Sequence, residues 1–250
     1  MLKHIIALTA ALMMIASAAS AAPDTLRVGT SGQAFPFSYS EGGKLRGFEI
    51  DVMRAIAGEL GIELEFVAAE QGAHIAMLDA ASVDTIASQI KVSPEMRARY
   101  LFTQPYIYDG AQVAVKRGNR DIHGVADLKG KQVAVIAGSG AGEKLRALPF
   151  GEQIAIQAYN GGLEQETALG KVDAFVMERT RAGRAILENP LPLELVGAPF
   201  TESRYALPFQ DNAAGRALLT QVDDALTTLK EDGTLSALSR EWFGIDVTLP

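Results

Sequence analysis

Short apolar segments alternate with amphipathic segments along this chain, and the alternation starts a second time near residue 113. In the first half, apolar residues at helical spacing predict helices over 50–60, 74–80 and 95–100. Short apolar runs bounded by Gly or polar residues predict strands at 26–30, 64–68 and 85–88. This order is typical of a mostly parallel sheet with helices on both faces.

The second half of the chain predicts another unit of the same kind. Its expected strands are 113–116, 133–136, 154–158 and 174–177. Its expected helices are 142–147, 163–169 and one that follows the last strand through residue 186. Two closing helices, over 213–229 and 235–243, are long enough to pack back on the first unit.

Two lobes joined by two crossings account for this restart better than a single six-strand sheet does. The crossings are expected near residues 110–113 and 203–207. The predicted fold class is therefore α/β, with two lobes and a two-strand hinge. We expect lobe one to comprise 22–111 with 205–250, and lobe two to comprise 112–204. Because α/β sheets bind ligands beyond the carboxyl ends of their strands, the cleft between the lobes is the predicted site.

The first residues predict export of the protein. Lys3 and His4 precede an apolar run over 5–15, and the small residues of 19–21 follow it. This pattern is typical of a signal peptide, with cleavage expected after Ala21. The run is much shorter than the roughly 20 apolar residues that a spanning helix needs. With no cysteine for a lipid anchor, a disulfide or a thiolate metal site, the expected location is the periplasm.

The charge pattern and the histidines exclude several classes of partner. Without Lys3 the chain keeps 22 basic and 30 acidic side chains, and no basic block appears, so we expect no nucleic-acid binding. His74 and His123 have no neighbours at metal or triad spacing, so no metal or catalytic site is predicted. The spacing of Gly138, Gly140 and Gly142 is not a dinucleotide fingerprint, and no cofactor is expected.

Seven segments in order resemble the periplasmic solute-binding proteins of amino-acid ABC importers, the bacterial extracellular solute-binding family 3. They are PF at 36–37, GFEID at 47–51, DTIASQIKVSPE at 84–95, FTQPY at 102–106, DLKGK at 127–131, GKVDA at 170–174, and DGT at 232–234 with EWFG at 241–244. The resemblance implies the type II two-lobe fold, a small polar solute, and delivery of that solute to an ABC permease in the inner membrane. It also implies a monomer without catalytic activity.

The resemblance implies a binding segment in lobe one that departs from the family pattern. Relatives place an arginine for the ligand carboxylate where this chain has Met96. Arg97 follows it, either as a shifted clamp or as a solvated helix charge, since one residue turns a helix by about 100°. Lys91 replaces a small hydroxyl residue and is either the counter-charge for the anion or a rim lysine. Ser88 and Gln89 are expected to flank it.

The resemblance also implies ligand contacts elsewhere in the cleft. Ser139 precedes a helix in lobe two and is expected either to help bind an anion or to cap that helix. Glu178 falls where relatives bind the ligand ammonium; the alternative is a structural carboxylate paired with Arg179 or Arg181. Ser31 and Gln71 stand at further cleft positions, and Gln71 replaces an aromatic residue of relatives. We therefore expect a solvated pocket lined by few aromatic side chains.

Two other functions remain open on the sequence alone. The chain is similar to periplasmic cyclohexadienyl dehydratases, and Glu202 lies in a segment that carries an acidic residue in them. Against this, Met96 again replaces a shared arginine, and Ala111 stands where a hinge lysine is expected. The second alternative is an accessory or sensor protein on the same fold. The ligand is left open among a small anion, a dicarboxylate and an unusual amino acid.

Overall fold

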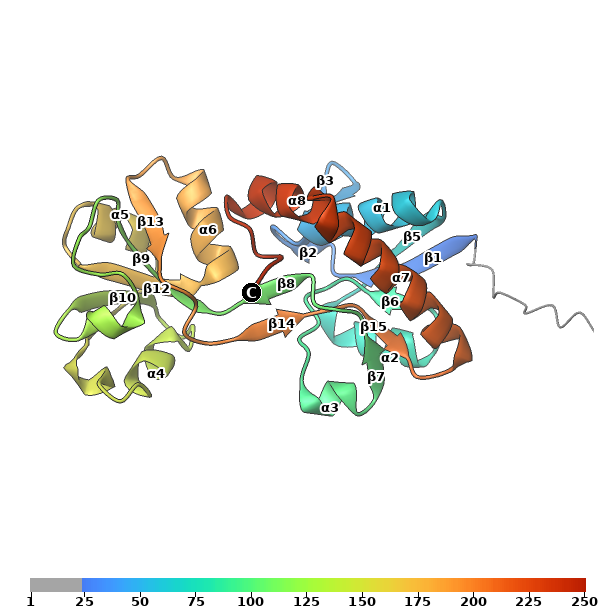
Figure 1. Cartoon of the computed structure of the whole chain (residues 1–250), viewed down its shortest axis with the longest axis horizontal. Helices are drawn as coiled ribbons and strands as arrows, with labels where there is room; N and C mark the ends of the chain where they lie inside the picture. The colour runs from blue at the N-terminus through green and yellow to red at the C-terminus, as the bar shows by residue number, and fades with distance from the viewer. Residues whose placement is uncertain (1–23) are drawn as a thin grey trace, which may run out of the picture.

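Two separate sheets form the cores of two α/β bodies in the computed structural model, which describes residues 24–250 (Figure 1). The cleavage site predicted after Ala21 lies outside the described residues. The first sheet has the order β5-β1-β6, and its strands are all parallel. Its elements are β1 (Thr25–Thr30), α1 (Phe48–Leu60), β5 (Glu63–Ala68), η1 (Gln71–Ala73), α2 (His74–Asp79) and β6 (Thr85–Ile86).

The second sheet has the order β11-β10-β12-β9-β13, with parallel strands in its first half and antiparallel pairs at β9. Its strands are β9 (Ala111–Lys116), β10 (Gln132–Ile136), β11 (Ala155–Tyr159), β12 (Ala174–Glu178) and β13 (Leu193–Val196). The helices of this body are η2 (Val125–Leu128), α4 (Ala141–Arg146), η3 (Gly151–Gln153), α5 (Leu163–Ala168) and α6 (Arg179–Glu188). Separate buried clusters cover its two faces, around Val133 and Val176 on one and Ala134 and Phe175 on the other.

Two short antiparallel strands connect the bodies, at the crossings that the sequence predicts. β8 (Ile107–Asp109) pairs with β14 (Ser203–Tyr205), and both run through the narrow middle of the molecule (Figure 1). Gly110 follows β8 and passes so close to the other crossing that a Cβ there would lie 1.8 Å from the carbonyl oxygen of Thr201. The close approach of the two crossings therefore depends on the absence of a side chain at Gly110.

The two last helices return to the first body, as the sequence predicts. α7 (Ala213–Glu231) and α8 (Thr234–Phe243) pack on α1, and their apolar residues share one core with β1 and α1. Trp242 also donates its indole N–H to Asp51 of α1 at 3.0 Å. The backbone of Gly47 before α1 has φ 128°, and a Cβ there would meet the carbonyl oxygen of Phe37 at 2.2 Å. Glycine thus fixes the turn into α1.

Several short elements differ from the predictions. The helix expected over 95–100 ends early, because residues from Tyr100 onward pair with a later strand. The elements concerned are α3 (Pro94–Arg97), β7 (Tyr100–Phe102) and β15 (Pro208–Gln210). A small three-stranded sheet that the sequence analysis did not predict comprises β2 (Gln33–Ala34), β3 (Ser38–Glu41) and β4 (Lys44–Arg46).

Candidate ligand-binding site

The candidate charges of the two lobes both lie next to the hinge, Lys91 against β14 and Glu178 opposite the first residue of β9. Lys91 forms an isolated bridge to Tyr205 of β14, and Val92 donates its N–H to the carbonyl of Arg204 at 2.9 Å. From lobe two, Glu178 ends β12 and lies opposite Ala111, the first residue after the crossing. Both positions follow the carboxyl ends of parallel strands, where α/β sheets bind ligands.

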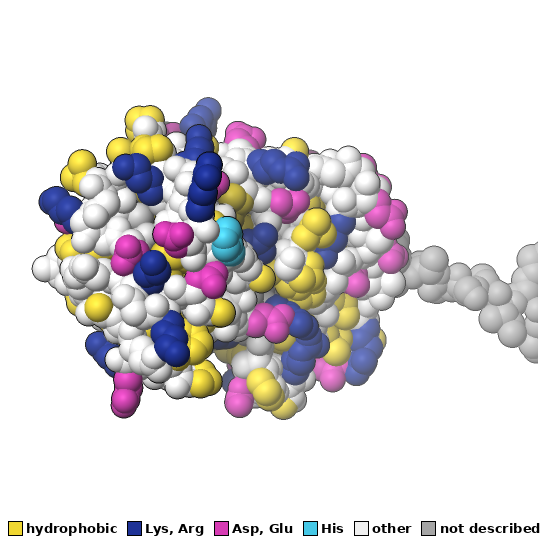
Figure 2. Space-filling view, turned by 60° about the vertical axis from the view of Figure 1, so that its left-hand side comes forward, with side chains coloured by type: hydrophobic (Ala, Val, Ile, Leu, Met, Phe, Trp, Pro, Cys, Tyr) yellow, Lys and Arg dark blue, Asp and Glu magenta, His cyan; other side chains and the backbone are white. Residues whose placement is uncertain are grey.

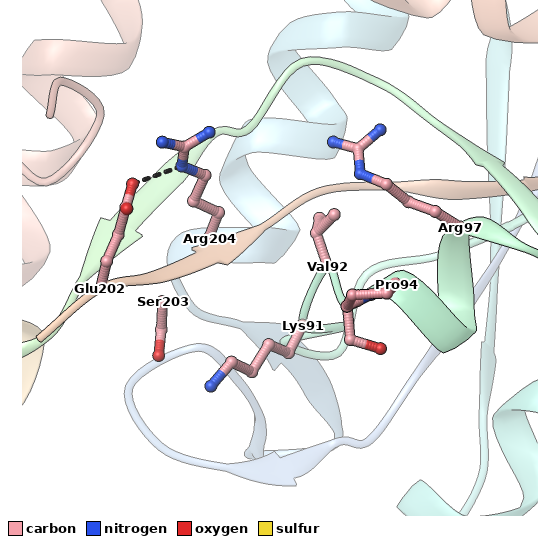
Figure 3. Close-up of a pocket in the computed structure, with 8 residues that line it drawn as sticks. Lys91, Val92, Pro94, Arg97, Glu202, Ser203 and Arg204 are labelled. Atoms are coloured by element: carbon pink, nitrogen blue, oxygen red, sulfur yellow. Dashed lines mark hydrogen bonds and ion pairs between the residues drawn. The ribbon is translucent and has the colours of Figure 1, made fainter.

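A cavity of about 500 Å³ opens on the lobe-one side of the hinge. Its lining is Lys91, Val92, Ser93, Pro94, Arg97, Glu202, Ser203 and Arg204. Figure 3 shows the guanidinium groups of Arg97 and Arg204 extending to the same side of β14, while Lys91 extends in a different direction. Arg204 is paired with Glu202 at 2.5 Å, so the other two cations are the ones left without an acid in this lining. The cavity is therefore suited to an anionic group.

Met96 and Arg97 behave differently although they are neighbours on α3. Met96 is half-buried and, like Ile90 and Phe102, packs against a cluster of buried apolar residues. Arg97 is exposed, and its guanidinium lies 6.0 Å from the centre of the Phe102 ring. Neighbouring residues of a helix differ in direction by about 100°, so Met96 points into the protein and Arg97 to the surface. A role of Arg97 in binding the ligand carboxylate stays a prediction.

Ser88 and Gln89 lie deeper than the sequence analysis implies. Ser88 is 1% exposed, and within residues 24–250 its hydroxyl has no hydrogen-bond partner. Gln89 has a left-handed backbone with φ 52°, and its N–H donates to Glu49 Oε1 at 2.7 Å. That N–H is therefore occupied inside the protein. Ligand contact by these two residues stays a prediction.

The buried carboxyl of Glu49 is hydrogen-bonded to the segment that leads to Lys91. Glu49 of α1 is fully buried and accepts hydrogen bonds from the Gln89 N–H and the Tyr106 hydroxyl. Burial raises the pKa of Glu49 to about 7, against the lowering effect of these two donors. Burial also raises the pKa of Tyr106, so its phenol remains a donor. Glu49 thus fixes the backbone of Gln89 two residues before Lys91.

The remaining predicted positions of lobe one are Ser31 and Gln71. Ser31 follows β1, is half-buried, and accepts the N–H of Gln33 at 3.3 Å. Gln71 begins η1, and its side chain lies outside what the structure describes. Phe35 is 50% exposed and stacks edge-on against Tyr39. The guanidinium of Arg184 from α6 lies 4.9 Å from the Phe35 ring, so a lobe-two cation covers the exposed aromatic residue.

In lobe two, the Ser139 side chain forms hydrogen bonds with backbone groups two and three residues away. Its hydroxyl donates to the carbonyl of Ile136 at 2.8 Å and accepts the N–H of Ala141 at 3.3 Å. Ser139 is exposed, so contact with an anion stays a prediction. Asp173 accepts the N–H of Gln132 at 2.8 Å, which is a structural role within the lobe-two sheet.

Glu178 pairs with a residue that the sequence analysis did not consider. Lys144 of α4 lies 2.5 Å from Glu178 Oε1. Arg179, one of the partners named in the structural alternative, instead donates to the carbonyls of Asp246 and Leu249 at 2.7 and 3.1 Å, so the ion pair of Glu178 is with Lys144 and not with Arg179. Lys144 is 34 residues from Glu178 in the sequence, so only the fold brings the two side chains together.

The hinge between the lobes is rich in acidic groups. Asp109 at the end of β8 accepts the N–H and the hydroxyl of Thr180 at 3.1 and 2.7 Å, which fixes the start of α6 to the hinge. Burial raises the pKa of Asp109, and the nearby Glu178 adds to this rise. Tyr205 has its pKa raised to about 12, chiefly by burial and then by Asp109 and Glu178. The hinge thus holds two carboxyl groups and a phenol that lie close enough to influence one another's ionisation.

Residues 24–250 hold no group of three His, Asp or Glu side chains placed to bind a metal ion. His74 is buried at the start of α2, and His123 is exposed. Glu202, the residue of the dehydratase alternative, is exposed and paired with Arg204.

No helix among the described residues is long and apolar enough to cross a membrane. Figure 2 shows a face on which basic and acidic side chains are interspersed.

Comparison with known proteins agrees with this geometry. The model of the bacterial extracellular solute-binding proteins, family 3, matches residues 26–245. The amino-acid ABC transporter-binding protein PatH of Vibrio harveyi is 39% identical over 247 residues, which are 99% of this chain and 100% of PatH. The L-cystine-binding protein TcyJ of Escherichia coli K12 is 33% identical, with 90% of this chain and 84% of TcyJ covered.

Two solved structures are similar over nearly the whole chain. The unliganded, open L-cystine solute receptor of Neisseria gonorrhoeae is 28% identical, with a TM-score of 0.76 over 90% of this chain and 95% of that one. An ancestral cyclohexadienyl dehydratase is 29% identical, with a TM-score of 0.73 over 89% and 93%. These similarities confirm the two-lobe type II α/β fold that was predicted from the sequence.

Proposed function

Because the chain belongs to the bacterial extracellular solute-binding proteins of family 3, we propose that it captures one amino acid or a close relative between its lobes and presents it to an ABC permease. Like its curated relatives, the chain is an amino-acid ABC transporter-binding protein and not an enzyme. We further propose that the protein acts in the periplasm, after cleavage behind Ala21, and that it acts as a monomer. The identity of the solute is proposed below.

Opposite charges on the two sides of one hinge carry this proposal. Lys91 adjoins β14 from lobe one, and Glu178 adjoins the start of β9 from lobe two. An α-amino acid carries a carboxylate and an ammonium on the same carbon, so it matches a cation on one lobe and an acid on the other.

The proposed mechanism is closure of the two lobes around the solute. Lobe one, taken as 22–111 and 205–250, binds the carboxylate first at Lys91. Lobe two, taken as 112–204, then rotates at the crossings beside Gly110 and brings Glu178 to the ammonium. Because the closed form makes contacts from both lobes, the solute shifts the population towards it. The permease recognises this closed form.

The names of relatives narrow the first compounds to test. Two of the similar proteins bind L-cystine by name, and the pocket lining here is polar and charged. We propose a polar amino acid, with L-cystine the first candidate. Its two α-carboxylates and two ammonium groups can engage charges on both lobes.

Isothermal titration calorimetry with purified protein and a panel of amino acids tests the proposal. We expect saturable binding of at least one polar amino acid. Glu178→Gln should weaken it by about 2 kcal/mol or more, because an ammonium would lose its charged partner in a partly buried cleft. Absence of binding by every amino acid in the panel would overturn the proposed function.

A further inference from the structure

The acid proposed for the ligand ammonium already has a cation beside it. Lys144 Nζ and Glu178 Oε1 lie 2.5 Å apart, and their side chains are 35% and 34% exposed. Both residues project from the carboxyl-end edge of the lobe-two sheet, since α4 follows β10 and Glu178 ends the neighbouring parallel strand β12. The pair is open to solvent on one side, so an entering solute meets a positive and a negative charge together.

The pair does not depend on the position of lobe one. α4 packs on β10, and β10 is hydrogen-bonded to β12, so Lys144 and Glu178 move as one body. Such a partly exposed ion pair contributes little to folding. Each partner also has unused capacity, because an ammonium has three donors and a carboxylate accepts about four hydrogen bonds. The two groups can therefore bind a ligand without first separating.

The presence of Lys144 changes which solutes fit. A solute ammonium at Glu178 would lie close to the ammonium of Lys144, and this repulsion disfavours a ligand with only a cationic group there. A second anionic group on the ligand removes the repulsion by binding Lys144. The α-carboxylate is meanwhile engaged by Lys91 in the electropositive cavity of lobe one.

From this arrangement we infer that Lys144 determines specificity, and that the solute is an α-amino acid whose side chain carries a second carboxylate. This inference rests on the proposed function and adds the chemical class of the ligand. The acidic amino acids and L-cystine belong to this class. L-glutamine and L-asparagine, the uncharged isosteres of the acidic amino acids, do not belong to it.

Calorimetry with matched ligands tests the inference. For the wild-type protein we expect L-glutamate, L-aspartate or L-cystine to bind at least tenfold more tightly than L-glutamine and L-asparagine. In Lys144→Met this preference should disappear, because the second carboxylate loses its partner while the amides lose nothing. Lys171→Met is the matched control: Lys171 forms an exposed ion pair with Glu166 before β12 begins, at the other edge of the same sheet.

The outcomes separate the two proposals. If neutral amino acids bind as tightly as the dicarboxylic ones and Lys144→Met leaves all affinities unchanged, the inference is overturned and the proposed function stands. If no amino acid binds the wild-type protein, the proposed function fails and the inference fails with it. Thermal unfolding of both variants checks that the fold is kept, and Lys144→Arg should retain the preference that Lys144→Met loses.

Discussion

The substitution Glu49→Gln should change how the stability of lobe one depends on pH. Glu49 is fully buried, and burial raises its pKa from the ordinary 4.5 to about 7. A carboxyl with a raised folded pKa binds more protons in the folded state than in the unfolded state between these values. The free energy of unfolding of the wild type therefore falls as pH rises through this window.

The size of the effect follows from the two pKa values. Each pKa unit corresponds to about 1.4 kcal/mol of free energy. The rise in the pKa of Glu49 from 4.5 to about 7 therefore corresponds to about 3 kcal/mol of folding free energy. Glutamine has no proton to lose. We therefore expect the difference in stability between Glu49→Gln and wild type to shift in favour of the variant by about 3 kcal/mol between pH 4 and pH 8.

Urea denaturation followed by Trp242 fluorescence measures this difference. Trp242 is the single tryptophan and bonds to α1, the helix that carries Glu49, so it reports on lobe one. Glu59→Gln, an exposed substitution on the same helix, is the control and should follow the wild-type profile. Parallel pH profiles for wild type and Glu49→Gln would refute the reasoning. They would mean that Glu49 is charged in the folded protein without a cost from burial.

Three further substitutions probe the hinge and the cavity. Gly110→Ala should lower the melting temperature by several degrees in differential scanning calorimetry, because its Cβ would overlap the Thr201 carbonyl; an unchanged value would mean that the crossing relaxes freely. Asp109→Ala should cost about 1 kcal/mol or more in denaturant unfolding, since both of its hydrogen bonds to Thr180 are lost, and an unchanged stability would mean that these bonds do not hold α6 to the hinge. Lys91→Met should weaken amino-acid binding in calorimetry tenfold or more, by about 1.5 kcal/mol; unchanged affinity would exclude Lys91 as the carboxylate partner.

The alternation of strands and helices was predictable because burial leaves a periodic trace in the sequence. Both lobes, the return of α7 and α8 and the two crossings follow from it. The sheet of β2, β3 and β4 was missed because its strands are short and mostly exposed, so no apolar pattern marks them. The pairing of β7 with β15 was missed because the partners are far apart in the chain.

The candidate site was predictable only in part, for a similar reason. Lys91 and Glu178 could be chosen from the resemblance to the family, and for Lys91 the strand end that precedes it supported the choice. The Lys144 partner of Glu178 depends on the neighbouring placement of β10 and β12, which no local pattern records. One signal was present: residues that follow adjacent parallel strands meet at the same edge of a sheet. The buried support from Glu49 to Gln89 likewise joins residues 40 positions apart.

Closure of the lobes is the central claim, and a distance across the cleft tests it most directly. α3 and α4 lie on the same side of the hinge, one on each lobe (Figure 1). Glu95→Cys and Glu143→Cys place labels on exposed sites of these helices, and the chain has no cysteine to interfere. We expect double electron–electron resonance to show a shorter distance with saturating L-cystine or L-glutamate, whichever the calorimetry shows to bind. A distance that stays the same with the bound amino acid would contradict the account.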